Sequence, residues 1–313
     1  MPSPRVAVVD IGSNTIKVLV AERAPSGQVS ALLSKTIDAR ISAGISQKNP
    51  RLTEHSMARG IDAIQQLLLN ASPFAPQRTI LVATSAVRDA ENGDDFQERV
   101  RATTGQSIRI LSGQEEANLI GRGLTCDPAL ASLSNFYVFD LGGGSLECLA
   151  FRQRQIEAGV SLQLGCVRLT EKLVADSAQP IASATLVEIQ NTTRATPEQS
   201  QFPFSLPAAT PAVGVGGTVT TVRAILAARA GKTLEATSTQ VERETLRDLM
   251  NELGSLSLEQ RKQVRGLPAG RADVFPTALA TLVAIADIGG FNAYQHSFYN
   301  LRYGLAADAL DSM

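Results

Sequence analysis

The first forty residues show a pattern of short apolar runs separated by polar turns. RVAVVDI (5–11) and TIKVLVAERA (15–24) have the apolar content of buried strands, with DIGSN forming the turn between them. A third strand is expected at 29–37. Because no helical pattern interrupts these strands, the segment is predicted to be a β-meander.

The remaining chain alternates between helical and strand periods. From Leu52 to Ala71, apolar residues recur at helical spacing. Further strands are expected at TILVAT, SIRILS, FYVFDL, LECLAF and AVGV, and further helices at FQERVRATTG, after Leu169, and over TVTTVRAILAARAG and VERETLRDLMNELG. Thr239 and Glu242 are expected to form a capping box. The polar, proline-rich segment 191–211 is expected to be an irregular connection. This mixture predicts an α/β protein.

One strand, turn and strand pattern occurs twice. AVVDIGSNTIKVLV, which begins at Ala7, aligns with YVFDLGGGSLECLA, which begins at Tyr137, at a constant offset of 130 residues. The alignment matches Asp10 with Asp140, Gly12 with Gly142 and Thr15 with Ser145. Two similar hairpins in the two halves of the chain predict two related lobes on either side of a cleft.

The glycine-rich turn in FDLGGGSLEC suggests phosphate chemistry. Glycines allow positive φ and let successive backbone N–H groups surround phosphate oxygens. The acids Asp140 and Glu147 flank the turn and would repel phosphate, so a divalent cation or a water is expected between them and the ligand. For one hairpin alone, a simple tight turn is the simpler explanation. The matched pair of hairpins favours phosphate binding.

The segment SGQEEANLIGRG contains two neighbouring glutamates with different expected roles. Ser112 and Glu115 have the spacing of a capping box, which gives Glu115 a structural role. Glu116 has no such local explanation, and a carboxylate in the first turn of a helix could orient a water for attack on phosphorus. The alternative is a surface acid stabilised by the helix dipole.

The segment AVGVGGTVTTVRAIL is a strand, a glycine-rich turn and a helix. This order places backbone N–H groups at a helix N-terminus, where an anion is stabilised. It has neither the third glycine of GxGxxG nor the lysine of a P-loop, so both of those motifs are excluded. Close packing of the strand against the helix is the alternative explanation.

Composition and charge narrow the class of protein. The 313 residues are 44% hydrophobic, which is enough for about two domains. Twenty-nine basic and thirty acidic residues leave a net charge of −1, which gives no indication of nucleic-acid or membrane-surface binding. Three cysteines without CxxC spacing indicate reduced thiols in a cytoplasmic protein. Cys166 could be a nucleophile, although a buried apolar role is favoured. No signal peptide or membrane-spanning segment is expected.

Seven segments together resemble the exopolyphosphatase and guanosine pentaphosphate phosphohydrolase family. In order, they are DIGSNTIKVLV, VATSAVRDAENGDDF, SGQEEANLIGRG, FDLGGGSLE, SLQLGCVRLTE, GVGGTVTTV and GRADVFPTALATL. They span nearly the whole chain, and their joint occurrence is far more specific than any one alone. The family belongs to the actin-like ATPase superfamily, so the resemblance implies two ribonuclease-H-like lobes around a cleft.

The resemblance also implies a role for particular residues. Glu116 matches a catalytic base, and Arg88 matches a phosphate-binding arginine. Asp140 and Glu147 match acids that hold a metal or the attacking water. The two phosphate loops match Gly12, Ser13 and Asn14 in the first and Gly142, Gly143, Gly144 and Ser145 in the second. A metal would be held by Asp10, Asp140 and Glu147, and a nucleotide would bind at Gly214, Gly216, Gly217 and Thr218.

The implied activity is hydrolysis of terminal phosphate from inorganic polyphosphate, with the 5′-phosphate of guanosine pentaphosphate as a second substrate. The implied cofactor is Mg²⁺ or another divalent cation. A homodimer is compatible with the sequence, which does not determine the oligomeric state. Two other functions are compatible with the same residues. One is a regulator that binds a nucleotide or alarmone without cleaving it, and the other is an ATP-dependent kinase of the same superfamily.

The end of the sequence resembles the short, two-domain members of this family. The sequence shows no counterpart of the C-terminal HD-type domain of the long members, and His55 and His296 alone could not supply its metal site. The resemblance therefore gives no reason to expect strong binding of long polyphosphate chains. The predicted domains are 1–124, joined by 298–313, and 125–297.

Overall fold

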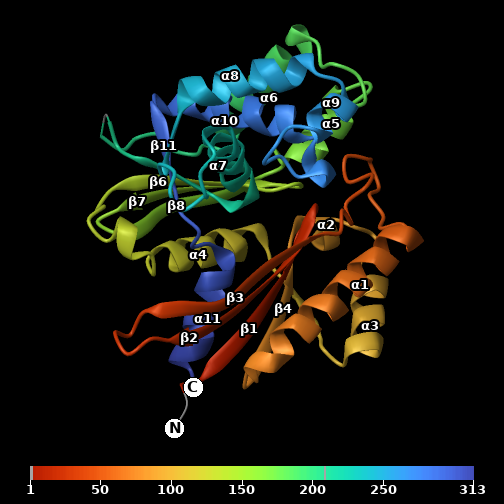
Figure 1. Ribbon diagram of the computed structural model, residues 1–313, viewed down its shortest axis with the longest axis vertical. Helices are drawn as coiled ribbons and strands as arrows, with labels where there is room; N and C mark the ends of the chain where they lie inside the picture. Colours follow the sequence, from red (N-terminus) through yellow and green to blue (C-terminus); the bar gives the residue numbers. More distant parts are fainter. Residues whose placement is uncertain (1–2, 208) are drawn as a thin grey trace. The chain divides into compact units, whose positions relative to one another are not determined.

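The computed structural model describes residues 3–207 and 209–313. The chain divides into two compact units, each of which is described by itself (Figure 1). The first unit extends to Ser132 and includes Tyr299–Met313, and the second is Leu133–Phe298. The predicted boundary at 124/125 falls at the end of a helix, before a short turn that remains with the first unit.

The first unit is built on a mixed sheet that has five strands among the described residues. The strands are β1 Arg5–Ile11, β2 Thr15–Arg23, β3 Val29–Asp38, β4 Arg78–Ala83 and β5 Ile108–Ile110. Their order is β3-β2-β1-β4-β5. The β1–β2 and β2–β3 pairs are antiparallel, as expected for the meander, whereas β1–β4 and β4–β5 are parallel.

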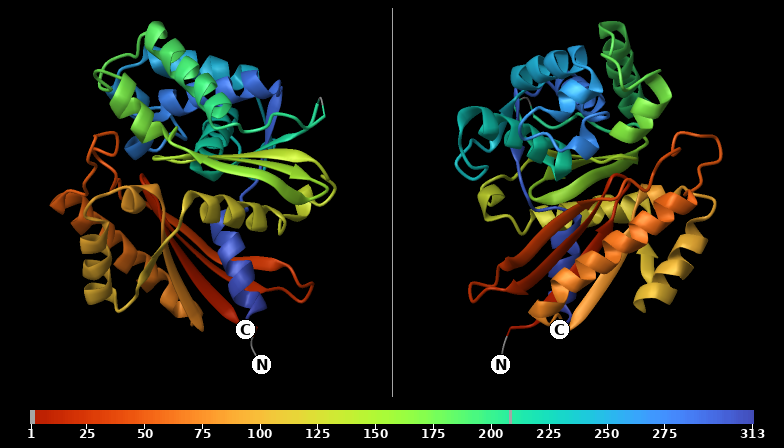
Figure 2. Two further views of the ribbon diagram at one scale, coloured as in Figure 1. Left: turned by 180° about the vertical axis from the view of Figure 1, so that it is seen from behind. Right: turned by 45° about the vertical axis from the view of Figure 1, so that its right-hand side comes forward.

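Helices cover both faces of this sheet. They are α1 Glu54–Ala71, α2 Ser85–Arg88, α3 Gly93–Thr104, α4 Gly113–Leu124 and α11 Leu301–Asp311, with 3-10 turns η1 Ser72–Phe74 and η2 Pro128–Leu130. Helices α1 and α3 lie on one face, and α4 and α11 lie on the other (Figures 1 and 2). Strand β1 is almost wholly buried between these layers, as its continuous apolar sequence predicts.

The second unit repeats this plan. Its strands are β6 Phe136–Leu141, β7 Leu146–Arg152, β8 Gln155–Leu162, β9 Ala212–Val215, β10 Gln240–Glu242 and β11 Ala293–His296. Within the described residues their order is β10-β11-β9-β6-β7-β8. Read from β8, the order matches that of the first sheet, with β11 in the place of β5 and β10 as an added edge strand. The α/β class and the two ribonuclease-H-like units are therefore confirmed.

The helices of the second unit surround one strongly apolar helix. They are α5 Cys166–Leu173, α6 Ser183–Gln199, α7 Gly216–Ala230, α8 Arg243–Ser255, α9 Leu258–Lys262 and α10 Phe275–Gly289, with a 3-10 turn, η3 Ala269–Arg271. Every residue of α10 from Phe275 to Ala286 is buried, and this helix packs against both α6 and α8. Its apolar run is thus explained by burial in protein. No helix in the described part of the chain is long and apolar enough to cross a membrane.

Two local predictions were wrong. Helix α6 extends to Gln199, through the first part of the segment expected to be irregular, because Leu186, Ile189, Thr193 and Pro197 form one buried face at helical spacing. Residues 200–207 and 209–211 are irregular, and residue 208 of this segment lies outside the described residues. The expected capping box at Glu242 is absent, because residues 240–242 instead pair with β11 as a strand.

Candidate functional site

The predicted site residues of the first unit gather at one edge of its sheet. Strands β1, β4 and β5 are parallel, so their carboxyl ends share this edge. The 12–14 turn follows β1, α2 follows β4, and the first turn of α4 comes shortly after β5. In open α/β sheets, ligands bind outside the carboxyl ends of the strands.

The turn after β1 is a two-residue hairpin loop, Ser13–Asn14. The Gly12 N–H donates to the Thr15 carbonyl at 3.1 Å, and the Ser13 hydroxyl lies 3.0 Å from the hydroxyl of Ser85 in α2. Asn14 is 5% exposed, and neither its amide oxygen nor its amide nitrogen has a partner among the described residues. Since buried amides are nearly always hydrogen-bonded in folded proteins, this group is suited to a polar ligand.

Arg88 and Glu116 form an ion pair at the same edge. The Arg88 Nη1 donates to Glu116 Oε2 at 3.1 Å and to the Leu111 carbonyl at 2.9 Å, and its Nε lies 3.5 Å from Asp89 Oδ1. The Glu116 side chain is only 9% exposed. The alternative interpretation of Glu116 as a surface acid is therefore wrong. The arrangement places a carboxylate next to a guanidinium.

Glu115 has the structural role that its spacing predicts. Its Oε2 accepts from the Ser112 N–H at 2.8 Å while the Glu115 N–H donates to the Ser112 hydroxyl, which completes the capping box. Arg109 Nη2 also donates to Glu115 Oε1 at 2.6 Å. These hydrogen bonds, with that from Arg109 the largest influence, lower the pKa of Glu115 to about 2. The two neighbouring glutamates thus lie in different environments.

The hairpin of the second unit has the same register as the first. Gly142 N–H donates to the Ser145 carbonyl at 3.0 Å, which leaves Gly143–Gly144 as the two-residue loop. The strand pairing is also the same in both hairpins, but one of the paired residues differs in charge. Asp10 lies opposite Lys17 in the first sheet, whereas Asp140 lies opposite Glu147 in the second. Only the second hairpin therefore brings two carboxylates together across the strands.

The triple glycine adopts a different geometry from the one expected. None of Gly142, Gly143 and Gly144 is among the glycines with positive φ in the described chain. The turn is instead packed closely against Gly165, where a Cβ would lie 2.2 Å from the Gly144 backbone. Helix α5 starts directly after this contact, earlier than expected, and its Val167 N–H donates to the Gly143 carbonyl at 2.9 Å.

The start of α5 also decides the interpretation of Cys166. This residue is 1% exposed, in agreement with a buried apolar role, and its N–H donates to the Gly142 carbonyl at 3.0 Å. The backbone of α5 therefore fixes the glycine turn from the carbonyl side. The Arg168 side chain adds a further contact, because its Nε donates to the Gly144 carbonyl at 3.0 Å.

The 214–218 segment lies beside the end of β6. Gly216 has φ +79°, and a Cβ there would lie 2.1 Å from Asp140 Oδ1, so only glycine fits without displacing that carboxylate. The Thr218 hydroxyl donates to the Leu141 carbonyl at 3.0 Å. Gly214 belongs to β9, and Gly217 lies in the first turn of α7. The predicted nucleotide segment and the second phosphate turn are thus neighbours.

Arg271 is a residue of this region that the sequence reasoning did not single out. It is 8% exposed, and a Cβ on Gly217 would lie 2.3 Å from its Nη1. The guanidinium donates to the hydroxyls of Thr221 at 3.1 Å and Thr218 at 3.4 Å, while its Nε has no partner among the described residues. The signal in the sequence was an arginine in GRADVF, directly before the long apolar run that forms α10. The structure places this cation at the N-terminus of α7, where an anion is stabilised.

The carboxylates of the second unit fit a divalent cation. Glu147 is 2% exposed and accepts from the Ser161 hydroxyl at 2.7 Å, and Asp140 lies directly opposite it on β6. No group of three His, Cys, Asp or Glu side chains in the described chain could hold a metal by itself. Mg²⁺ usually takes only one or two protein carboxylates and completes its shell with water and substrate phosphate. The Asp140–Glu147 pair matches that requirement.

The overall sequence identifies the family to which this arrangement belongs. The sequence profile of one phosphatase family, Ppx/GppA, matches residues 19–313. The chain belongs to the Ppx/GppA phosphatase family. This result confirms the resemblance found from the seven segments.

Relatives of this family member include the guanosine-5′-triphosphate,3′-diphosphate pyrophosphatase of Aeromonas salmonicida. It is 28% identical over 303 residues, which cover 97% of this chain and 59% of the relative. The chain therefore spans less than two thirds of the length of that relative.

Among solved structures, an exopolyphosphatase from Cytophaga hutchinsonii is 23% identical with a TM-score of 0.87, covering 99% of this chain and 98% of that one. The Aquifex aeolicus Ppx/GppA family member is 22% identical with a TM-score of 0.79, covering 99% of each chain. Both solved structures support the fold.

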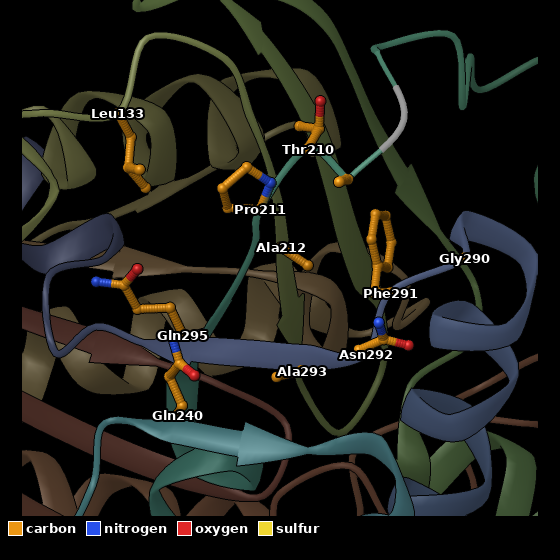
Figure 3. A pocket seen from close by; sticks show the side chains of 11 residues that line it. Leu133, Thr210, Pro211, Ala212, Gln240, Gly290, Phe291, Asn292, Ala293 and Gln295 are labelled. Atoms are coloured by element: carbon orange, nitrogen blue, oxygen red, sulfur yellow. The ribbon is translucent and has the colours of Figure 1, made fainter.

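This Ppx/GppA family member also has a cavity away from its predicted site residues. It has a volume of about 410 Å³ and lies where β9 and β11 begin, at the amino edge of the second sheet (Figure 3). Its lining includes the Phe291 ring, the Thr210 hydroxyl and the amides of Gln240, Asn292 and Gln295. Because none of its lining residues is charged, this cavity is poorly suited to phosphate.

Proposed function

We propose that the chain is a phosphohydrolase that removes terminal phosphate from inorganic polyphosphate, with the 5′-phosphate of guanosine pentaphosphate as a second substrate. The observation that carries this proposal is the ion pair between the half-buried Arg88 and the buried Glu116, at the sheet edge that also presents the 12–14 turn. A guanidinium binds phosphate oxygens well, and an adjacent carboxylate can accept a proton. Together they suit attack of water on a phosphoryl group.

In the proposed reaction, binding places the terminal phosphoryl group in line with a water. Glu116 accepts the proton of that water as it attacks phosphorus. Arg88 and the Asn14 amide stabilise the negative charge on the phosphoryl oxygens. The turn 142–145 and the buried Arg271 are assigned to the phosphates as well. The leaving group is the shortened polyphosphate, so the products are orthophosphate and a chain one unit shorter.

The proposed cofactor is Mg²⁺ or a similar divalent cation. Asp140 and Glu147 would hold it, and it would neutralise charge on the phosphate oxygens. Asp10 is assigned to the same cation from the sequence alone. Its cross-strand neighbour is Lys17 and not a second carboxylate. We therefore expect Asp10 to contribute less to cation binding than Asp140 and Glu147.

The relatives support the substrate class. One relative is named as a pyrophosphatase of guanosine pentaphosphate, and another is called an exopolyphosphatase. Guanosine pentaphosphate and polyphosphate are the two substrates proposed here. Nucleotide binding at 214–218, a homodimer and a cytoplasmic location remain predictions from the sequence. Each is compatible with phosphohydrolysis and is not required by it.

The test is a substrate panel measured side by side. Purified protein is given tripolyphosphate, long-chain polyphosphate, guanosine pentaphosphate or ATP, with Mg²⁺ or with a chelator, and released orthophosphate is followed. We expect Mg²⁺-dependent release from at least one polyphosphate and loss of release in Glu116→Gln. Binding of these ligands without release from any would favour a regulator. ADP formed only after addition of a small-molecule acceptor would favour a kinase.

A further inference from the structure

A loop next to the first phosphate turn carries a buried polar group without a partner. This loop, residues 39–45, is the first part of the connection between β3 and α1. Ser42 lies in it, is 2% exposed, and its hydroxyl has no hydrogen-bond partner among the described residues. Burying a hydroxyl without a partner costs free energy, which a ligand that accepts its hydrogen bond would offset. Alanine at this position would avoid that cost.

The 39–45 loop is bonded directly to the phosphate turn. The Ser42 N–H donates to the Ser13 carbonyl at 3.2 Å, and the Arg40 N–H donates to the Asn14 carbonyl at 2.8 Å. The main chain therefore holds Ser42 beside the two residues of the hairpin loop. Asn14 also has a buried side-chain amide without a partner. Two unsatisfied polar side chains thus come from two bonded backbone segments.

The backbone of the loop is strained where it meets the turn. Arg40 has φ +43°, which is uncommon for a residue with a side chain. Its carbonyl accepts from Arg59 Nη2 of α1 at 2.7 Å, which helps to hold this conformation. Strain of this kind is maintained only where the surrounding structure enforces it, and it is frequent at ligand sites. The strain, the N–H contacts and the unpaired hydroxyl all occur at the same point of the loop.

We propose that the Ser42 hydroxyl is a further substrate-binding group, which donates to a phosphoryl oxygen alongside the Asn14 amide. The proposal rests on the proposed function, because it assigns Ser42 to the same phosphate substrate. A hydroxyl can donate one hydrogen bond, and a phosphoryl oxygen is a strong, charged acceptor. Ligand binding would then satisfy a group that the free protein leaves unsatisfied.

This assignment predicts opposite effects on stability and on binding. In Ser42→Ala, the melting temperature of the ligand-free protein should stay the same or rise, because an unsatisfied hydroxyl is removed. The Kd for tripolyphosphate with Mg²⁺ should rise by roughly 10- to 100-fold, the range for a hydrogen bond to a charged group. In turnover, KM should rise much more than kcat falls, because the contact is made in the bound substrate as well as in the transition state.

The first unit offers a matched control. Ser56 is 1% exposed, but its hydroxyl accepts from Thr53 Oγ1 at 3.0 Å. Ser56→Ala should therefore lower the melting temperature and leave the Kd for tripolyphosphate unchanged. Ser42→Cys is the second variant, since its thiol is close to serine in size and only a weak donor. Ser42→Cys should also raise the Kd for tripolyphosphate, as Ser42→Ala does. If Ser42→Ala fails to fold, the Kd of Ser42→Cys tests the role of the hydroxyl.

The measurements separate this inference from the proposed function. Wild-type binding and turnover of tripolyphosphate are measured first, followed by Kd values of the variants. If the wild type binds without turnover, the hydrolase proposal fails while the Kd of Ser42→Ala still decides the role of Ser42. If Ser42→Ala and Ser42→Cys bind as tightly as the wild type, the hydroxyl only holds a buried water and the inference is wrong. If the wild type neither binds nor cleaves tripolyphosphate, both proposals fall.

Discussion

At the scale of single residues, the two adjacent glutamates of α4 have different partners, so their proposed roles in stability and in catalysis can be tested separately. Glu115 bonds Ser112 and the exposed Arg109, whereas Glu116 is buried and paired with Arg88. A glutamine at 115 can still accept from the Ser112 N–H. A glutamine at 116 can still contact Arg88 but cannot take a proton from water. The two substitutions should therefore have different effects.

We predict that Glu116→Gln lowers kcat by roughly 10²–10⁴-fold, the usual contribution of general acid–base catalysis. Its melting temperature should fall moderately, because Arg88 loses the charge of its buried partner. Glu115→Gln should change neither quantity appreciably, since an exposed ion pair contributes little. Measurement of kcat and melting temperature for both variants checks this. The reverse pattern would show that base and cap are interchanged, and unchanged kcat in both would assign water activation to Asp140 or Glu147.

His296 gives a pH-dependence that can be worked out from its contacts. It is 5% exposed; Arg223 Nη1 lies 2.7 Å from its Nδ1, and its Nε2 lies 3.0 Å from the Thr220 hydroxyl. Because arginine can only donate, Nδ1 is the acceptor and the ring is neutral. Burial and then the charge of Arg223 lower the pKa of His296 from 6.5 to about 4. The imidazole ring is thus held neutral in the folded protein.

We predict that stability falls as the pH is lowered from 6.5 to about 4. In this range the unfolded histidine binds a proton that the folded one does not, so the folded state loses up to roughly 3 kcal/mol relative to higher pH. Urea unfolding at several pH values measures this. His296→Gln should flatten the profile, whereas substitution of the exposed His55 by glutamine should not. An equally steep profile in His296→Gln would assign the loss to other groups.

At the scale of secondary-structure elements, the close approach of α4 and α11 fixes the helix that carries Glu116. A Cβ on Gly123 would lie 2.0 Å from the Asn300 carbonyl oxygen, and one on Gly304 would lie 2.0 Å from the Leu119 carbonyl oxygen. Backbone atoms cannot yield as flexible side chains do. The two helices can therefore approach this closely only with glycine at both positions.

We predict that Gly123→Ala and Gly304→Ala each reduce the free energy of unfolding by about 1–3 kcal/mol or more, the usual cost of overpacking. The helix propensity of alanine, which would add about 1 kcal/mol of stability, should not compensate fully. Chemical denaturation measures the effect, with the exposed Asn118→Ala on α4 as the control. If both glycine variants are as stable as the wild type, the two helices can move apart without a loss in the free energy of unfolding.

The elements also show how far sequence reasoning reaches. The meander, the repeated hairpins and the capping box at Ser112 were predicted correctly, because each depends on residues close together in the sequence. The helical end of α6 and the strand β10 were missed, since both depend on burial or pairing with distant segments. The candidate site shows the same limit. Arg271 and Ser42 were not identified from the sequence, because their surroundings are formed by segments that are distant in the sequence.

At the scale of the whole molecule, charge limits the choice of substrate. Basic and acidic residues nearly balance, with a net charge of −1. Many arginines of the described chain are paired with carboxylates at the surface, as Arg99 is with Glu54 and Arg229 with Glu252. A long polyanion needs an extended run of unpaired positive charge to increase its affinity. If polyphosphate is the substrate, as proposed, this balance favours recognition of its chain end over binding along its length.

We predict that activity depends only weakly on the length of the polyphosphate. Expressed per chain end, kcat/KM for a long chain should exceed that for tripolyphosphate by less than about tenfold, because the additional phosphates find little extra positive potential. KM for both substrates should also change by similar factors between low and physiological salt, since screening acts on the same few contacts at the chain end. Orthophosphate release at matched concentrations of chain ends measures both. A KM for the long chain that is a hundredfold lower, and that rises steeply with salt, would instead indicate an extended basic surface along which the polyanion binds.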